Sequence, residues 1–230
     1  QNKNLLAINK PAGLVVYSKD PERKSVMKNL LNDFPELSKV GKEPRHGMIH
    51  RLDKDTSGIL LIAKNEEAFR FFTNQFKNRK VVKKYTALSF GELKRERGII
   101  QTLIGRSPKH RTQQKVFSLF SMNRKGKKRA ITFFKVVGRY KKKEQDYTLL
   151  EVEIKTGRTH QIRVHLKYLG YPVVGDQTYR FRNQEKESLK RQFLHASFLK
   201  IPLLNNKIET IQSSLPEDLD NFLEKLNEVS

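Results

Sequence analysis

The chain has 230 residues, with 47 Lys and Arg against 24 Asp and Glu, so its formal net charge at pH 7 is +23. Its 14 Phe and 7 Tyr residues provide apolar material for a core, which argues against a disordered chain. The absence of Cys excludes disulfides, thiolate metal ligands and cysteine nucleophiles, and the positive charge makes nucleic acid the expected partner, ahead of an anionic membrane.

The first part of the chain is predicted to mix short strands with helices. Strands are predicted at residues 5–9, 14–17 and 59–63, and helices at residues 25–34 and 66–78. Asn65 is the expected N-cap of the second helix. On that helix Phe69, Phe72 and Phe76 recur at i, i+3 and i+7, a spacing typical of a stripe that packs into a core.

The rest of the chain is predicted to be mainly strands. Residues 82–90 alternate in polarity, which places Tyr85 on the less apolar face. Ile162, Leu166 and Leu169 form the expected buried stripe of a later helix. Listed in order, the remaining predictions are short extended pieces with basic loops at 91–143, a strand at 147–155, a helix from Thr159 to about Gly170 and an acidic helix at 217–229. Because strands outnumber helices without regular alternation, we expect an α+β protein with a mixed, mostly antiparallel sheet.

The sequence does not predict a membrane protein. The longest wholly apolar run, residues 59–63, is far below the roughly 18 residues that a membrane span requires. No signal-like apolar stretch opens the sequence. We therefore expect a cytoplasmic protein with no membrane partner. We also expect a monomer.

The densest polar cluster, HRLDKDTSG at residues 50–58, lies in a loop directly before the buried strand at 59–63. A loop held by a strand is a common place for catalytic groups. One interpretation is structural, with Asp53 and Asp55 capping turns and pairing with Arg51 and Lys54. Another is the paired-aspartate box of Mg²⁺-dependent aspartyl phosphatases. That box should follow an apolar strand and have a Thr or Val two residues after its second Asp. Here His50 and Arg51 precede it and Ser57 occupies that position, so the match is poor.

A second cluster, TGRTHQIRVH at residues 156–165, joins a strand to the N-terminus of a helix. Backbone N–H groups at that point, beside Arg158, would favour an anion. Arg163 lies one turn into the helix, next to the buried stripe, where an unpaired charge is costly. It therefore needs an acidic partner, and the pairing is either a structural salt bridge or a contact with a catalytic aspartate.

Together the two clusters resemble the RluA family of RNA pseudouridine synthases. HRLDKDTSGILLIAKN at residues 50–65 is followed by KKYTAL at 83–88 and TGRTHQIRVHLKYLGYPVVGD at 156–176. LLAINKPAGLVV near the start, LHA at 194–196 and LPED at 215–218 resemble further family motifs in the same order. Tyr17 and Ile201 stand where a His is common in the family, and neither position is catalytic by analogy.

This resemblance implies isomerisation of uridine in RNA, in which the N1–C1′ bond breaks, the uracil rotates and a C5–C1′ bond forms. Asp53 matches the catalytic aspartate, which either attacks C1′ or removes the 2′ proton, and the sequence does not decide between these. Arg163 matches the basic residue that pairs with this aspartate and keeps it ionised. Tyr85 matches the tyrosine that stacks on the uracil and assists removal of the C5 proton.

The family resemblance also implies the fold and the absence of a metal or cofactor. The expected pseudouridine synthase fold has one sheet shared by two subdomains, with a central catalytic cleft. We expect residues 1–230 to form a single catalytic domain. No S4-type RNA-binding module precedes Leu5, so either an upstream module is missing from this sequence or the catalytic domain binds RNA alone.

RNA contacts are expected from the basic residues. The target uridine must leave its stack to reach Asp53, and Arg51 is a candidate to fill the vacated space, with a phosphate contact as an equally weighted alternative. The other predicted RNA contacts are His50, Arg158, His160, Lys109, Arg111, Arg124, Lys127, Lys128 and Arg129. The expected substrate is 23S ribosomal RNA, with tRNA second. The alternative from another class is a non-catalytic RNA-binding or ribosome-assembly protein.

Overall fold

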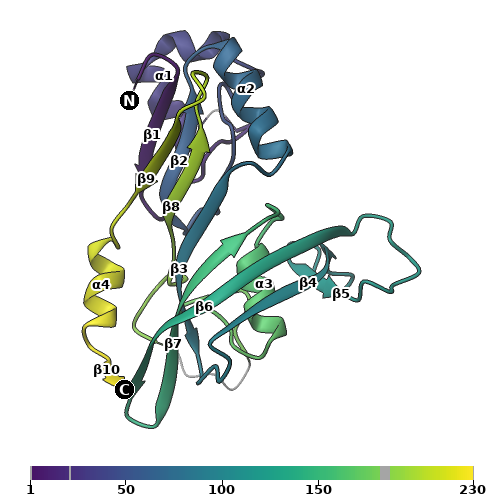
Figure 1. Ribbon diagram of the computed structural model, residues 1–230, viewed down its shortest axis with the longest axis vertical. Coiled ribbons are helices and arrows are strands. Elements are labelled where there is room, and N and C mark those ends of the chain that lie inside the picture. The colour runs from purple at the N-terminus through teal and green to yellow at the C-terminus, as the bar shows by residue number, and fades with distance from the viewer. Residues whose placement is uncertain (1, 21, 182–186, 230) are drawn as a thin grey trace. The chain divides into compact units, whose positions relative to one another are not determined.

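A computed structural model describes residues 2–20, 22–181 and 187–229, and the chain divides into two compact units (Figure 1). Unit 1 comprises Gln1–Val82 and Ala196–Ser214, and unit 2 comprises Lys83–His195 and Leu215–Ser230. The chain therefore passes from one unit to the other three times.

Unit 1 is a small sheet with helices. Its elements are β1 (Leu5–Lys10), α1 (Val26–Asp33), the 3₁₀ helix η1 (Pro35–Lys39), β2 (Ser57–Ala63), α2 (Glu66–Lys77), most of β8 (Leu194–Pro202) and β9 (Ile208–Gln212). The strand order is β1-β2-β8-β9, and β1 pairs antiparallel with β2, as β9 does with β8. Every side chain of β2 is buried, and Leu61, Phe72 of α2 and Ile201 share one apolar core. The core thus holds β2, the strand that follows the HRLD loop, rigidly in place.

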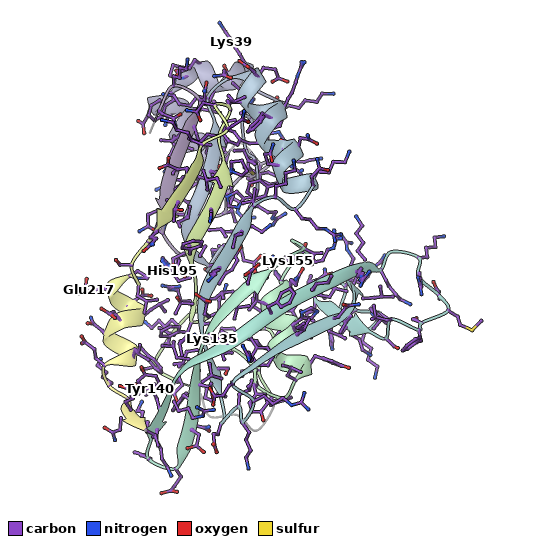
Figure 2. The ribbon with its side chains drawn as sticks, in the orientation of Figure 1. Lys39, Lys135, Tyr140, Lys155, His195 and Glu217 are labelled. Atoms are coloured by element: carbon purple, nitrogen blue, oxygen red, sulfur yellow. The ribbon has the colours of Figure 1, made fainter. Side chains whose placement is uncertain are left out.

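Unit 2 is built on long antiparallel strands. Its elements are β3 (Val82–Phe90), β4 (Arg97–Arg106), β5 (Gln114–Phe117), β6 (Lys128–Lys142), β7 (Gln145–Ile154), α3 (Gln161–Tyr168), α4 (Glu217–Leu223) and β10 (Asn227–Val229). The strand order is β3-β7-β6-β4-β5, with β10 on β6, and the registers of these pairs are antiparallel. Figure 2 shows Lys135 and Tyr140 along β6 and Glu217 at the start of α4.

The α+β class and the mostly antiparallel sheet are confirmed. The two early helices begin where the sequence predicts, because Ser25 accepts a hydrogen bond from the N–H of Lys28 and Asn65 accepts one from Ala68. No helix in the described part of the chain is long and apolar enough to cross a membrane.

Several local predictions were wrong. The acidic helix ends at Leu223 rather than continuing to 229, because Asn227–Val229 pairs with β6 instead. The extended piece at 14–17 forms only an isolated bridge between Val15 and Ser25. Leu169, expected in the buried stripe of α3, is partly exposed because the helix ends at Tyr168. The N-cap of α3 is His160, not Thr159.

Candidate active site

Asp53 lies in the short loop that leads into β2. Its backbone carbonyl accepts a hydrogen bond from the N–H of Thr56 at 3.2 Å, which closes a tight turn over Lys54 and Asp55. The residue is half-buried, whereas Thr56 and the strand that follows are buried. The turn therefore presents Asp53 at the edge of a rigid element.

A buried lysine holds this turn in place through hydrogen bonds to backbone carbonyls. The ammonium group of Lys10, at the end of β1, donates to the carbonyls of Pro11 at 2.6 Å, Leu14 at 2.8 Å and Lys54 at 2.9 Å. Lys10 is fully buried, and a charge without hydrogen-bond partners would be costly there. Lys10 thus ties the turn after β1 to the residue next to Asp53. Sequence analysis gave Lys10 no role, although it lies within the LLAINKPAGLVV motif.

His50 and Arg51, both predicted to contact RNA, have different surroundings. The Nε2 atom of His50 accepts a hydrogen bond from the backbone N–H of Leu61 at 3.1 Å, and its ring stacks on Phe76 with centroids 4.9 Å apart. Arg51 is exposed, and its guanidinium carbon lies 5.7 Å from the centre of the Tyr17 ring. His50 therefore stabilises the fold, while Arg51 faces solvent beside Asp53.

Tyr17, which replaces the common histidine, is shared by two arginines. Arg45 lies 4.9 Å from the centre of its ring and donates a hydrogen bond to its hydroxyl at 2.8 Å. Arg51 approaches the same ring, so the aromatic face orients two guanidinium groups. Tyr17 thus contacts the guanidinium groups of Arg45 and of Arg51 in the HRLD loop.

Tyr85 lies on β3 in unit 2, opposite Val152 of β7. The alternation along β3 is as predicted, but the face that carries Lys83, Tyr85 and Ala87 is the buried one, with Tyr85 7% exposed. The other face is also covered near the end of the strand, at Leu88, so polarity alone did not reveal which face is exposed. Burial lowers the pKa of Lys83 to about 8, and the nearby charge of Lys155 acts in the same direction.

Arg163 forms a buried, two-pronged ion pair with Asp176. Its Nε donates to one carboxylate oxygen at 2.6 Å and its Nη2 donates to the other at 2.9 Å. Asp176 also accepts hydrogen bonds from the backbone N–H groups of Thr178 and Tyr179, at 2.8 and 3.0 Å. The acidic neighbour expected for Arg163 is therefore present as Asp176. The pairing of Arg163 with Asp53 stays a prediction. Sequence analysis missed Asp176, although it is the last residue of the TGRTHQ to VVGD motif.

Tyr179 links several predicted residues around α3. The guanidinium carbon of Arg163 lies 5.1 Å from the centre of its ring. Its hydroxyl accepts a hydrogen bond from the N–H of Gln114 at 2.8 Å and lies 2.8 Å from Nδ1 of His160. His160, predicted to contact RNA, thus has a partner within the fold, and its backbone is left-handed with φ 55°. Tyr179 lacked any sequence signal except its position after the VVGD motif.

The side chain of Gln161, the first residue of α3, bonds to the segment before the helix and to β6. The N–H of Arg158, which we expected to favour an anion, donates to Oε1 of Gln161 at 3.0 Å. The same oxygen accepts a hydrogen bond from the hydroxyl of Thr156 at 2.8 Å, and Nε2 donates to the carbonyl of Ile131 at 3.0 Å. The Nε of Arg158 donates to the carbonyl of Arg129 at 3.0 Å. These contacts join α3 to β6 and engage the N–H of Arg158 and its Nε atom within the fold.

The remaining predicted RNA contacts lie on unit 2. Lys109 and Arg111 are exposed in the loop between β4 and β5. The second set follows β5: Arg124, Lys128 and Arg129 are exposed and Lys127 is half-buried. Lys155, directly after β7, adds another basic side chain to this unit (Figure 2). The structure therefore places most of the predicted phosphate contacts at the surface of one unit.

Comparison with known proteins places these motifs in a family. The sequence profile of the family described as RNA pseudouridylate synthase matches residues 4–168. An uncharacterized RNA pseudouridine synthase, YlyB of Bacillus subtilis, is 38% identical over 98% of this chain and 71% of its own length. The ribosomal large subunit pseudouridine synthase D of Nitrosomonas europaea is 37% identical over 98% of this chain and 64% of its own length. The chain thus spans about two thirds of these relatives.

A solved structure agrees with the sequence comparisons. Human RNA pseudouridylate synthase domain containing 1 superposes with a TM-score of 0.79 and 28% identity, covering 100% of this chain and 87% of that chain. The resemblance drawn from the HRLD, KKYTAL and HQIRVH segments is therefore confirmed. The chain belongs to the RluA-type RNA pseudouridylate synthases, a family of isomerases that act on RNA.

Proposed function

We propose that this chain converts uridine to pseudouridine in the RNA of the large ribosomal subunit, with tRNA as the second candidate substrate. The main support is the family match over residues 4–168, which include Asp53, Tyr85 and Arg163. The choice of ribosomal RNA is supported by the name of the Nitrosomonas relative.

Asp53 is the proposed catalytic carboxylate. In the isomerisation the N1–C1′ bond breaks, the C5–C1′ bond forms, C5 loses a proton and N1 gains one. Asp53 either attacks C1′ or removes the 2′ proton, and both routes need a carboxylate that is ionised and fixed in position. The hydrogen bond from Lys10 to the carbonyl of Lys54 supports the second requirement, because it holds the residue next to Asp53.

Arg163 and Tyr85 are the proposed partners of Asp53. A guanidinium has five N–H donors, so Arg163 can hold Asp176 with Nε and Nη2 and still donate to a second carboxylate. The structural and catalytic interpretations of Arg163 are therefore compatible. Tyr85 offers a ring for stacking on the uracil, and its hydroxyl is proposed to assist removal of the C5 proton.

Two isosteric variants of one loop test the proposed chemistry. RNA labelled with tritium at C5 of uridine releases tritium when pseudouridine forms, because C5 loses its proton. Asp53→Asn should abolish this release while leaving RNA affinity within about twofold. Asp55→Asn, two residues along the same turn, should retain the activity. Tritium release by Asp53→Asn at the parent rate would contradict the proposal.

The same pair separates isomerisation from the phosphatase alternative. A paired-aspartate phosphatase would need both carboxylates and a divalent metal, so Asp55→Asn and EDTA would each abolish its turnover. Within the described residues, no three His, Asp or Glu side chains are grouped as a metal site. Tritium release that survives both treatments would contradict the phosphatase interpretation.

The RNA target is tested in cells. Pseudouridines are mapped in total RNA from cells that lack the gene and from complemented cells. Loss of a position in large-subunit RNA supports the proposed substrate, and loss confined to tRNA selects the second candidate. An unchanged map, together with no activity of the pure protein, would favour the non-catalytic RNA-binding alternative.

A further inference from the structure

The loop between β5 and β6, residues 118–127, exposes two large apolar side chains. Phe120 is 91% exposed and Met122 is 99% exposed, more than the other large apolar residues of the described chain that lie at the surface. In Figure 1 this loop extends beyond the strands of unit 2 that flank it. Single exposed apolar residues are ordinary, but two at alternate positions on one projecting loop form a local apolar tip.

Contacts within the loop tie two of its cations, Arg124 and Lys127, to the loop backbone. Nη2 of Arg124 donates to the carbonyl of Leu119 at 3.0 Å. The ammonium group of Lys127 donates to the carbonyl of Asn123 and lies 4.5 Å from the centre of the Phe117 ring. Two of the predicted phosphate contacts therefore stabilise the loop backbone. Phe120, Met122 and Lys125 are exposed on the same loop.

The surroundings of the tip are strongly basic. Lys125, Lys128 and Arg129 are exposed in the same segment, and Lys115 is exposed on β5. A partner for this surface must therefore combine apolar faces with negative charge. Single-stranded RNA has both, because each base has an apolar face and each nucleotide carries a phosphate. Apolar side chains inserted between bases are a known way of contacting nucleic acids.

We propose that Phe120 and Met122 contact unstacked bases of the RNA substrate, while Lys125, Lys128 and Arg129 contact the neighbouring phosphates. This inference rests on the proposed function, which makes RNA the substrate. It separates the basic residues of this segment into two roles: Arg124 and Lys127 shape the loop, and Lys125, Lys128 and Arg129 bind phosphate.

A fluorescence experiment on the full chain tests the contact. Because the chain has no Trp, Phe120→Trp introduces a single fluorophore at the tip. Saturating single-stranded RNA of 20 nucleotides should reduce quenching of this Trp by iodide at least threefold. Ile99→Trp, at another exposed apolar position of unit 2, is the matched control and should stay accessible. Equal quenching of Phe120→Trp with and without bound RNA would overturn the proposal.

Binding measurements separate the apolar contact from the phosphate contacts. The Phe120→Ala/Met122→Ala variant should bind the same RNA about tenfold more weakly, with an unchanged slope of log K against log salt. Lys125→Ala/Lys128→Ala should instead lower that slope by about 1.4. Binding by the apolar variant within twofold of the parent would refute the contact, and circular dichroism checks that each variant is folded.

Other occupants of the tip give different results. A blue shift of the Phe120→Trp emission with phosphatidylglycerol vesicles but not with RNA would assign the loop to a membrane and overturn the proposal. A mass that doubles with concentration in the parent but not in the apolar variant would assign it to a second copy of the chain. If the parent releases no tritium but RNA protects Phe120→Trp, the proposed activity fails and the RNA contact stands.

Discussion

Burial should decide how much each of two similar ion pairs contributes to stability. The Nε atoms of Arg163 and Arg191 each donate to an aspartate oxygen at 2.6 Å, and the second prongs measure 2.9 and 2.8 Å. The carboxylates differ in exposure: the side chain of Asp176 is 0% exposed and that of Asp218 is 50% exposed. Substituting each with asparagine removes the charge and leaves the shape almost unchanged.

The expected costs differ several-fold. Asp176→Asn removes the buried carboxylate charge that Arg163 holds with two hydrogen bonds, a change that costs about 3–5 kcal/mol in the free energy of unfolding. Asp218→Asn breaks a pair whose carboxylate is half exposed to water and salt, so it should cost about 0–1 kcal/mol. Asp176→Asn also weakens the acceptor of the N–H groups of Thr178 and Tyr179, which adds to the first value.

Urea unfolding followed by far-ultraviolet circular dichroism at pH 7 measures both costs against the parent. Asp176→Asn should also lower pseudouridine formation, because Arg163 loses its anchor, while Asp218→Asn should leave it unchanged. A cost for Asp176→Asn no larger than that for Asp218→Asn would refute the argument from burial.

Three further predictions concern other parts of the chain. Burial lowers the pKa of His165 to about 4, so below pH 6.5, its ordinary pKa, the unfolded chain takes up a proton that the native state does not. The free energy of unfolding should therefore fall by about 3 kcal/mol between pH 6.5 and 4. In thermal melts across this range, His165→Asn should show a smaller fall. Gly58→Ala should lower the free energy of unfolding in urea by about 3 kcal/mol or more, because φ is +112° and the added Cβ would lie 2.4 Å from the carbonyl oxygen of Ala196. Gly157→Ala, whose added Cβ would have no atom within 4 Å, should be nearly neutral. Equal costs for the two variants would contradict this prediction. Lys10→Met should lower tritium release at least tenfold and leave RNA affinity within twofold of the parent, because three carbonyls lose their hydrogen-bond donor. Unchanged tritium release would show that Lys10 does not position the Asp53 loop.

The parts of the fold that sequence predicted depend on local rules. The cap Asn65 and the Phe stripe of α2 lie within a few residues of the helix they define. The alternation of β3 is equally local. The candidate catalytic residues came from motif order along the chain, which needs no knowledge of the fold.

The contacts that sequence did not predict join distant positions. Lys10 reaches the carbonyl of Lys54, and the hydroxyl of Tyr179 reaches Gln114, across segments that no periodicity connects. The C-terminal segment, residues 217–229, likewise depends on a contact with a distant strand. Its helical pattern continues past Leu223, but pairing with β6 determines the structure of Asn227–Val229.

Because the chain crosses between its two units three times, the units cannot easily be produced as separate fragments. A fragment that ends at Val82 lacks Ala196–Ser214, which completes the sheet of unit 1 with β8 and β9. A fragment that ends at Ser214 keeps unit 1 but removes α4 and β10 from unit 2. Neither unit can therefore be expressed by simple truncation of the gene. Isolating unit 1 requires a new linker from Val82 to Ala196. A nick at any of the three connections leaves fragments that must reassociate to restore the fold.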